Sequence, residues 1–357
     1  MPKLPTPIRV VIIDDSRAMT DLLALILRAA GDIHVVGTAA NGEEGVRLVQ
    51  RLHPDLVTMD IYMPGMNGAE AVREIMRTHP VPIVIISANT KPHTMDLGFQ
   101  ALRAGALTIL NKPVANDPQS NQALIQAVRL MAGVPVIHHW GTVTPKLSKT
   151  RIETRSVKKG LLVTRNMKSK IRAVGIAAST GGPSTLAAVL KNLPPDFPLP
   201  VALVQHFSPG FATGLADWLG TQTKLNVELA IHGANYQPGK VLLAPDDYHM
   251  AVNRAGKVEL SKGPAYKGLR PSANPLFESL AAVYGSGALG IILTGMGDDG
   301  VDGLQKIHEA GGVTIAQDKD SCVVYGMPRE AIARGTVDTS LTPEQIGFTL
   351  RQFTGKD

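Results

Sequence analysis

The chain has 357 residues, 44% of them hydrophobic, and a formal net charge of +6, a length that suits two ordinary domains with separate cores. No run of about 18 uncharged apolar residues occurs, and the start of the chain lacks an apolar segment ending in a small-residue cleavage site, so we expect a cytoplasmic protein that is not membrane-embedded. Its single cysteine, Cys322, excludes an internal disulfide and a multi-thiolate metal site.

Four short runs rich in valine and isoleucine alternate with helix-like stretches in the first third of the chain. The runs are RVVIID (9–14), DLVTMD (55–60), PIVIIS (82–87) and ALTILN (106–111). Such runs are typical of strands buried on both faces, and their alternation with helices predicts a parallel sheet.

Polar residues follow these runs. Asp14 is the last residue of the first run, and Asp15 follows it. Asp60 and Ser87 are the last residues of the second and third runs, and Lys112 follows the fourth. Three converging carboxylates repel one another and favour a cation, and all-oxygen ligation favours Mg²⁺. The set suits phosphoryl transfer, with Asp60 as nucleophile and the Ser87 hydroxyl and Lys112 on the phosphoryl oxygens. The alternative is that the aspartates only cap helices and form turns.

The segments VIIDDS, VTMDIYMPGMNG, IVIISA and LNKP resemble the signatures of the response-regulator receiver domain, from residue 8 to about 131. The resemblance implies a flavodoxin-like domain in which Asp60 accepts phosphate from a histidine kinase. It also implies that Asp14 and Asp15 help to hold Mg²⁺, and that Ser87 and Lys112 sense the phosphorylated state.

Three positions depart from the common receiver pattern. Ile109 stands where many receivers have an aromatic switch residue, Tyr62 is large for its position, and Asn67 replaces an aspartate before Gly68. We expect the first two to affect switching geometry and the dephosphorylation rate while acceptance of phosphate stays intact.

A basic stretch follows the first domain. From 141 to 172 there are ten lysine and arginine residues against one glutamate, a local charge of +9, so the rest of the chain carries −3. Sparse apolar residues there could not offset the entropy of ordering, which predicts a flexible linker over 132–170 between domains at 1–131 and 171–357. A docking segment for an acidic partner is the alternative, and we expect no nucleic-acid partner.

The second half repeats the alternation of strands and helices. Its apolar runs are AVGIAA (173–178), VALVQH (201–206), KVLLAP (240–245), LGIILTG (289–295) and GVTIAQD (312–318). The fold class is therefore α/β, with two doubly wound parallel-sheet domains of which the second is larger and Rossmann-like.

Three of these apolar runs lead to Ser179, His206 and Asp299, the nucleophile, base and orienting acid of acyl transfer. In an open parallel sheet, the carboxyl ends of the strands face one crevice where such residues can meet. Taken singly, Ser179 could be a helix cap, His206 a packed histidine and Asp299 an ordinary turn residue.

The segment GMGDDG (295–300) also fits G-x-G-x-x-G, with Asp318 and Asp320 about 20 residues further on, which is typical of nucleotide binding. Against this interpretation, two adjacent carboxylates would face the pyrophosphate.

The segments GIAASTGGP, VQHF, LTGMGDDG and SCVVYGMPREA resemble the catalytic domain of the chemotaxis protein-glutamate methylesterases, over about 171–350. The resemblance implies Ser179 as nucleophile, His206 as base and Asp299, rather than Asp298, as the orienting acid. It implies backbone amides of Met296 and Thr180 as oxyanion donors. Asn274 replaces an expected acidic residue, and we expect that change to affect substrate contacts more than chemistry.

The combined resemblance implies a phosphorylation-regulated hydrolase that removes methyl esters from glutamates of chemoreceptor cytoplasmic domains and deamidates receptor glutamines. Mg²⁺ would serve only the receiver, the ester chemistry would need no cofactor, and the protein would be a monomer. Two alternatives stay open, namely a receiver fused to a nucleotide-binding α/β enzyme or to a catalytically idle receptor-docking module.

Overall fold

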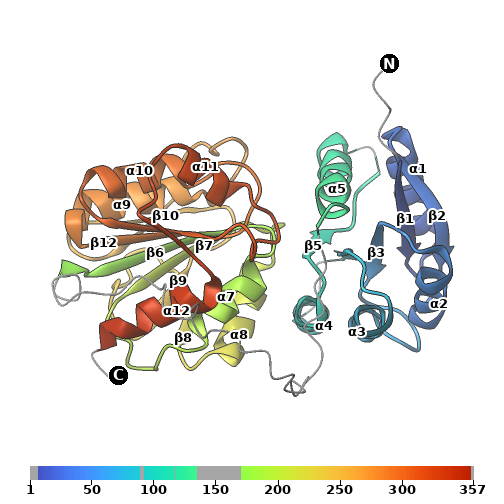
Figure 1. Cartoon of the computed structure of the whole chain (residues 1–357), viewed down its shortest axis with the longest axis horizontal. Helices are drawn as coiled ribbons and strands as arrows, with labels where there is room; N and C mark the ends of the chain where they lie inside the picture. The colour runs from blue at the N-terminus through green and yellow to red at the C-terminus, as the bar shows by residue number, and fades with distance from the viewer. Residues whose placement is uncertain (1–6, 89–91, 116, 135–169, 355–357) are drawn as a thin grey trace, which may run out of the picture. The chain divides into compact units, whose positions relative to one another are not determined.

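The computed structural model describes residues 7–88, 92–115, 117–134 and 170–354, and the chain divides into two compact units, residues 1–150 and 151–357 (Figure 1). The linker predicted over 132–170 lies outside the described residues except at its two ends, so the domain boundaries stay predictions. Among the described helices, none combines the length and the apolar character that a membrane span requires.

The first unit is a five-stranded parallel sheet in the order β2-β1-β3-β4-β5, which is the flavodoxin-like order. Its strands are β1 (Ile8–Ile13), β2 (Ile33–Ala39), β3 (Leu56–Asp60), β4 (Ile83–Ser87) and β5 (Thr108–Asn111). Its helices are α1 (Arg17–Ala29), α2 (Gly42–Leu52), α3 (Gly68–Thr78), α4 (Pro92–Ala104) and α5 (Pro118–Met131). Helices α1 and α5 pack together, and α2, α3 and α4 pack in series.

The predicted strands of this unit, β1, β3, β4 and β5, are present, and two of them are buried throughout. Every residue of β3 and β4 is buried, as expected of strands covered by helices on both faces. The edge strand β2 was not predicted, because most of its residues are at least partly exposed and it lacks a continuous apolar run.

The second unit is a seven-stranded parallel sheet in the order β14-β13-β12-β6-β7-β9-β8, with a separate antiparallel pair, β10 and β11. The large sheet contains β6 (Ala173–Ala178), β7 (Val201–Gln205), β8 (Asn226–Leu229), β9 (Lys240–Leu243), β12 (Ala288–Ile292), β13 (Val313–Gln317) and β14 (Thr339–Leu341). The pair is β10 (His249–Val252) and β11 (Val258–Ser261). The predicted fold class, two doubly wound parallel sheets, is confirmed.

Helices cover both faces of this sheet, with α9, α10 and α11 on one face and α7, α8 and α12 on the other (Figure 1). They are α7 (Gly182–Leu190), α8 (Ala212–Gln222), α9 (Ala273–Tyr284), α10 (Val301–Glu309), α11 (Met327–Ala333) and α12 (Pro343–Arg351). Short 3₁₀ turns follow α9 (Gly285–Gly287) and α12 (Gln352–Thr354).

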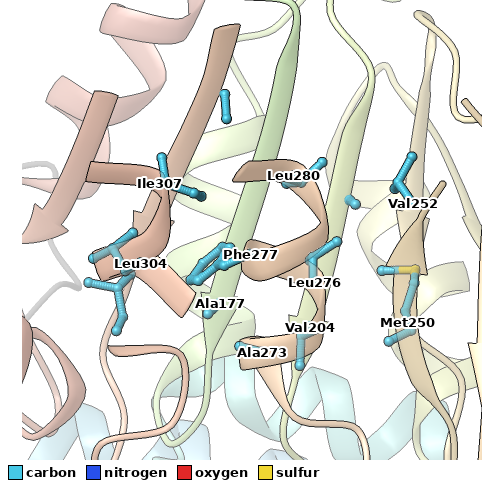
Figure 2. Close-up of a cluster of buried hydrophobic side chains, with 14 of the residues drawn as sticks. Ala177, Val204, Met250, Val252, Ala273, Leu276, Phe277, Leu280, Leu304 and Ile307 are labelled. Carbon is cyan, nitrogen blue, oxygen red and sulfur yellow. The ribbon is translucent and has the colours of Figure 1, made fainter. Parts of the chain in front are cut away.

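Helix α9 lies close against the sheet. Figure 2 shows its Phe277 and Leu280 in the buried cluster beside strand β6. A Cβ atom on Gly175 of β6 would lie 2.6 Å from Leu280 and 3.0 Å from Phe277, so only glycine permits this approach. The close packing places the amino end of α9 at the carboxyl edge of the sheet.

The strand order reverses direction at β6. The chain continues from β6 to β7 on one side and later places β12 on the other side. Ligand sites of open α/β sheets lie at such switch points, beyond the carboxyl ends of the strands. Ser179, His206 and Asp299 follow β6, β7 and β12, so all three lie at this edge.

Candidate active site

Ser179 follows strand β6 and is only partly buried. Its backbone N–H donates to Thr294 O at 3.0 Å, and its carbonyl accepts from Gly182 N at 2.8 Å. The N-cap of α7 is Gly181, with φ +77°, and it makes no side-chain cap bond. Ser179 is therefore not the helix cap, and within the described residues its hydroxyl has no hydrogen-bond partner.

His206 and Asp299 form a pair whose side chains are 9% and 2% exposed. His206 Nε2 lies 2.8 Å from Asp299 Oδ2. Because the carboxylate accepts a hydrogen from Nε2, Nδ1 is the nitrogen left to accept a proton. Ser179 and His206 come directly after Ala178 and Gln205, which are paired in the β6–β7 register. The described residues show no Ser179–His206 hydrogen bond, a contact that often tightens only with bound substrate.

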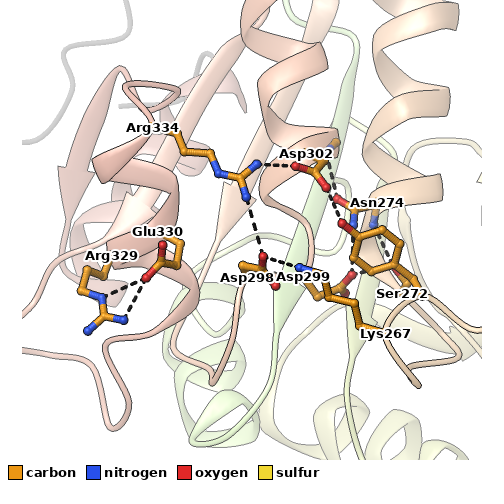
Figure 3. A network of polar contacts seen from close by, with 11 residues as sticks. Lys267, Ser272, Asn274, Asp298, Asp299, Asp302, Arg329, Glu330 and Arg334 are labelled. Carbon is orange, nitrogen blue, oxygen red and sulfur yellow. Dashed lines mark hydrogen bonds and ion pairs between the residues drawn. The ribbon is translucent and has the colours of Figure 1, made fainter.

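The Asp299 carboxylate is held by the amino end of α9. Oδ1 accepts from Ser272 Oγ at 2.5 Å, and Oδ2 accepts from Ala273 N at 2.7 Å. Figure 3 shows Ser272 and Asn274 beside Asp299. Burial raises the pKa of Asp299, but the His206 hydrogen bond and charge, followed by Ala273 N–H and Ser272, hold it below the usual value. Asp299 is 2% exposed and still carries a negative charge at neutral pH.

Asn274 belongs to the same cluster. It is 3% exposed, its Nδ2 donates to Asp299 Oδ1 at 3.2 Å, and its Oδ1 accepts from Gly303 N at 2.9 Å. The expectation that Asn274 affects substrate contacts is therefore wrong, because the side chain is inside the protein and supports the acid. Sequence analysis also missed Ser272. Its place before an apolar helix marks a helix start, but nothing local pairs that start with Asp299.

The segments on either side of Ser179 in space contain backbone N–H groups without a partner. Within the described part of the chain, the N–H groups of Thr180 and Met296 donate no hydrogen bond. A Cβ atom on Gly295 would lie 2.7 Å from Ser179 Cβ and 2.3 Å from the Met327 sulfur. Only glycine therefore lets residue 295 lie against the serine, and Met296 with its unpaired N–H is the next residue along the chain.

The neighbouring carboxylate has different partners. Asp298 lies 2.6 Å from Lys267 Nζ and 3.6 Å from Arg334 Nη2, and its side chain is 27% exposed (Figure 3). Arg334 also pairs with Asp302, which accepts from the Tyr266 hydroxyl. The structure thus separates the two aspartates of GMGDDG, since only Asp299 contacts the histidine.

The first unit brings its predicted residues together at the carboxyl edge of its own sheet. Oxygen atoms of Asp14, Asp15 and Asp60 lie within 4.8 Å of one another, and Lys112 Nζ lies 2.8 Å from both Asp14 and Asp60. Burial raises the pKa of Asp60 above its usual value, although the hydrogen bond and charge of Lys112 act to lower it. Ser87 is buried at the end of β4, where its carbonyl accepts from Lys112 N. The all-oxygen donor set fits a hard cation such as Mg²⁺.

The three positions that depart from the common receiver pattern differ in their exposure and contacts. Ile109 is fully buried, whereas Tyr62 is 62% exposed. Asn67 caps α3 and forms a capping box with Glu70, so it performs the capping role that an aspartate would perform.

Comparisons with known proteins cover both units. A sequence model described as "CheB methylesterase" matches residues 174–350, and one described as "Response regulator receiver domain" matches residues 10–127. The chain is 42% identical to a Geobacter metallireducens "Protein-glutamate methylesterase/protein-glutamine glutaminase 4", over 95% of this chain and 96% of the relative. It is 41% identical to a Syntrophus aciditrophicus "Protein-glutamate methylesterase/protein-glutamine glutaminase 1", over 98% and 99%.

A solved structure is similar to the second unit. The crystal structure of the Thermotoga maritima CheB methylesterase catalytic domain matches with a TM-score of 0.50 and 39% sequence identity. The match covers 51% of this chain and 98% of that one.

Proposed function

The chain belongs to the CheB methylesterase family and carries a response-regulator receiver domain, and we propose that it hydrolyses glutamate γ-methyl esters of chemoreceptors under control of phosphorylation. The observation that carries the proposal is the buried His206–Asp299 pair beside Ser179 at the switch point of the sheet. The substrate would be the cytoplasmic domain of a methylated receptor, which places the enzyme in the cytoplasm.

In the proposed reaction, His206 Nδ1 takes the Ser179 hydroxyl proton while Asp299 holds the hydrogen on Nε2. Ser179 Oγ attacks the ester carbonyl, and the N–H groups of Thr180 and Met296 stabilise the oxyanion. The imidazolium returns its proton to the departing methoxy group, so methanol leaves. Water then adds to the acyl-enzyme with His206 as base and releases the glutamate carboxylate and free serine.

The same residues support deamidation of receptor glutamines. An amide differs from the ester only in its leaving group, so His206 would protonate nitrogen and ammonia would leave in place of methanol. The printed names of the Geobacter and Syntrophus relatives include both activities.

We also propose that Asp60 accepts a phosphoryl group from a chemotaxis histidine kinase. Asp14, Asp15 and Asp60 would hold Mg²⁺, which would offset the negative charge around the phosphoryl group. Lys112 already contacts Asp60 at 2.8 Å and would pair with a phosphoryl oxygen, and the Ser87 hydroxyl would accompany it. Ile109 offers no aromatic ring to rotate, so control would not depend on such a rotation.

The two alternative functions have less support. The family matches favour the esterase over a nucleotide-binding enzyme, and Asp299 is turned to His206 rather than open for a phosphate. An idle docking module would not require a buried histidine–aspartate pair beside two unused amides.

Methanol release from methylated receptor membranes distinguishes these functions. We expect the protein to release methanol and to do so faster with Mg²⁺ and a small phosphodonor. No release from membranes that bind the protein would support the idle docking module instead.

A further inference from the structure

We propose that Gln205 is a positioning residue that fixes the nucleophile and the base relative to each other. Its side-chain amide donates to the backbone carbonyls of both Ser179, at 2.7 Å, and His206, at 2.8 Å. This inference rests on the proposed hydrolysis at Ser179, and it assigns a role to a residue that does not touch the substrate.

Both hydrogens of the Gln205 amide are used in this bridge. Gln205 is the last residue of β7, it is 4% exposed, and it precedes His206 directly. Ser179 belongs to the neighbouring strand end, 26 positions earlier in the chain. One amide group therefore connects the two loops through side-chain hydrogen bonds, in addition to the backbone bond from His206 N to Ala178 O at 3.1 Å.

The amide oxygen of Gln205 shows that the bridge is not an ordinary core contact. Oε1 is buried and has no hydrogen-bond partner among the described residues. A Cβ atom on Gly182 would lie 1.8 Å from this oxygen, so the glycine leaves the space that the amide occupies. A buried polar atom without a partner is unfavourable, and an apolar side chain of similar volume would avoid that cost. The two donated hydrogen bonds are what glutamine adds here.

The consequence for the reaction is geometric. Proton transfer from Ser179 to His206 requires the two side chains to approach within hydrogen-bond reach when substrate binds. Displacement of a reacting group by about 1 Å can cost on the order of 10²-fold in rate. Loss of the bridge should therefore lower kcat while the substrate-binding surface stays intact.

The chain offers a matched control at the other end of the same two strands. The Tyr236 hydroxyl lies 2.7 Å from Val174 O in β6 and 3.0 Å from Pro200 O just before β7, and it accepts from Val174 N. Tyr236 is buried, so Tyr236→Phe also removes a buried polar bridge between these strands, far from the carboxyl edge.

The experiment compares the full-length wild type, Gln205→Leu, Gln205→Glu and Tyr236→Phe. Three measurements are made on each: kcat and KM for methanol release, the rate of Ser179 modification by a sulfonyl fluoride, and the melting temperature. The modification rate reports on the serine–histidine pair without any receptor substrate.

We expect Gln205→Leu to lose about 10- to 100-fold in kcat and in modification rate, with little change in KM. Gln205→Glu should be worse at neutral pH, because a carboxylate would face two carbonyl oxygens. Its rate relative to wild type should recover as the pH falls, because a protonated carboxyl can donate one hydrogen. Tyr236→Phe should lower the melting temperature but leave kcat and the modification rate unchanged.

Normal modification by folded Gln205→Leu, or equal losses in Tyr236→Phe, would overturn the positioning role. If Gln205→Leu does not fold, a Gln205→Glu rate ratio that does not change with pH would overturn it. A wild type that releases no methanol, combined with slower modification of Gln205→Leu, would refute the receptor substrate and support the role of Gln205.

Discussion

Replacement of Asp299 by asparagine tests how the buried pair works. Asp299 Oδ2 lies 2.8 Å from His206 Nε2. Two unit charges at about that separation attract by about 6 kcal/mol at an effective dielectric constant of about 20. In the proposed reaction His206 gains a positive charge when it takes the Ser179 proton, so this attraction would stabilise mainly the transition state. At about 1.4 kcal/mol per factor of ten, we expect a loss of about 10⁴ in kcat.

An asparagine cannot satisfy the donors around this position. Asp299 Oδ2 accepts from His206 and Ala273 N–H, and Oδ1 accepts from Ser272 and Asn274. If the asparagine NH₂ group takes the place of Oδ2, it faces the Ala273 N–H, which is also a donor. His206 Nε2 must then accept a hydrogen bond, so the ring hydrogen moves to Nδ1. If the NH₂ group takes the place of Oδ1, it faces the Asn274 Nδ2 donor. Activity falls in both orientations because the charge is lost in both.

Asp298→Asn is the matched control. Asp298 pairs with Lys267 and Arg334 at the surface and does not contact His206. Exposed ion pairs contribute about 0–1 kcal/mol, so kcat should change less than about fivefold. The assay is the initial rate of methanol release at saturating substrate, with melting curves to verify folding. Equal losses in the two variants, or a larger loss in Asp298→Asn, would refute the assignment of the orienting acid.

Three further predictions concern control, pH and packing. Asp60→Ala should make the esterase rate indifferent to Mg²⁺ and a small phosphodonor, and stimulation of this variant would place the phosphoacceptor elsewhere. The pKa of Asp299 is held below its usual value in the folded state, so its contribution to stability is present above the unfolded-state pKa and is lost as the pH falls through the lowered pKa. The melting-temperature difference between wild type and Asp299→Asn should therefore shrink below about pH 4, and a difference that stays constant would contradict an ionised carboxylate. Gly295→Ala would place a methyl group 2.7 Å from Ser179 Cβ and 2.3 Å from the Met327 sulfur. It should cost about 1–3 kcal/mol of stability and on the order of 10²-fold in kcat, whereas normal kinetics would show that the loop tolerates displacement.

The strand-end residues could be predicted because their placement follows from one rule. Buried parallel strands are visible as apolar runs, and their carboxyl ends share an edge, so Asp60 and His206 were placed by counting to the end of a run. The partly exposed strands β2, β8 and β14 have no continuous apolar run and gave no such signal, whereas the partly exposed β5 was still visible as the run ALTILN.

The residues that support the site could not be predicted in the same way. Ser272 contacts Asp299 from 27 positions away, and Gln205 contacts Ser179 from 26 positions away. The Ser272 contact depends on how closely α9 packs against β6, which Gly175 permits. The Gln205 contact needs the space that Gly182 leaves for its amide, and neither requirement is a local pattern. The sequence thus locates the proposed reacting groups at the strand ends but not the hydrogen bonds around them.

The central claim is that Ser179 is the nucleophile of a receptor methylesterase. Its most direct test is methanol release from methylated receptor membranes by wild type, Ser179→Ala and Ser184→Ala. Ser184 is an exposed serine in α7 whose hydroxyl donates to Gly181 O at 3.2 Å, so it controls for the loss of a nearby hydroxyl. We expect wild-type rates from Ser184→Ala and a loss of several orders of magnitude from a folded Ser179→Ala. Near-normal methanol release by folded Ser179→Ala would contradict the account.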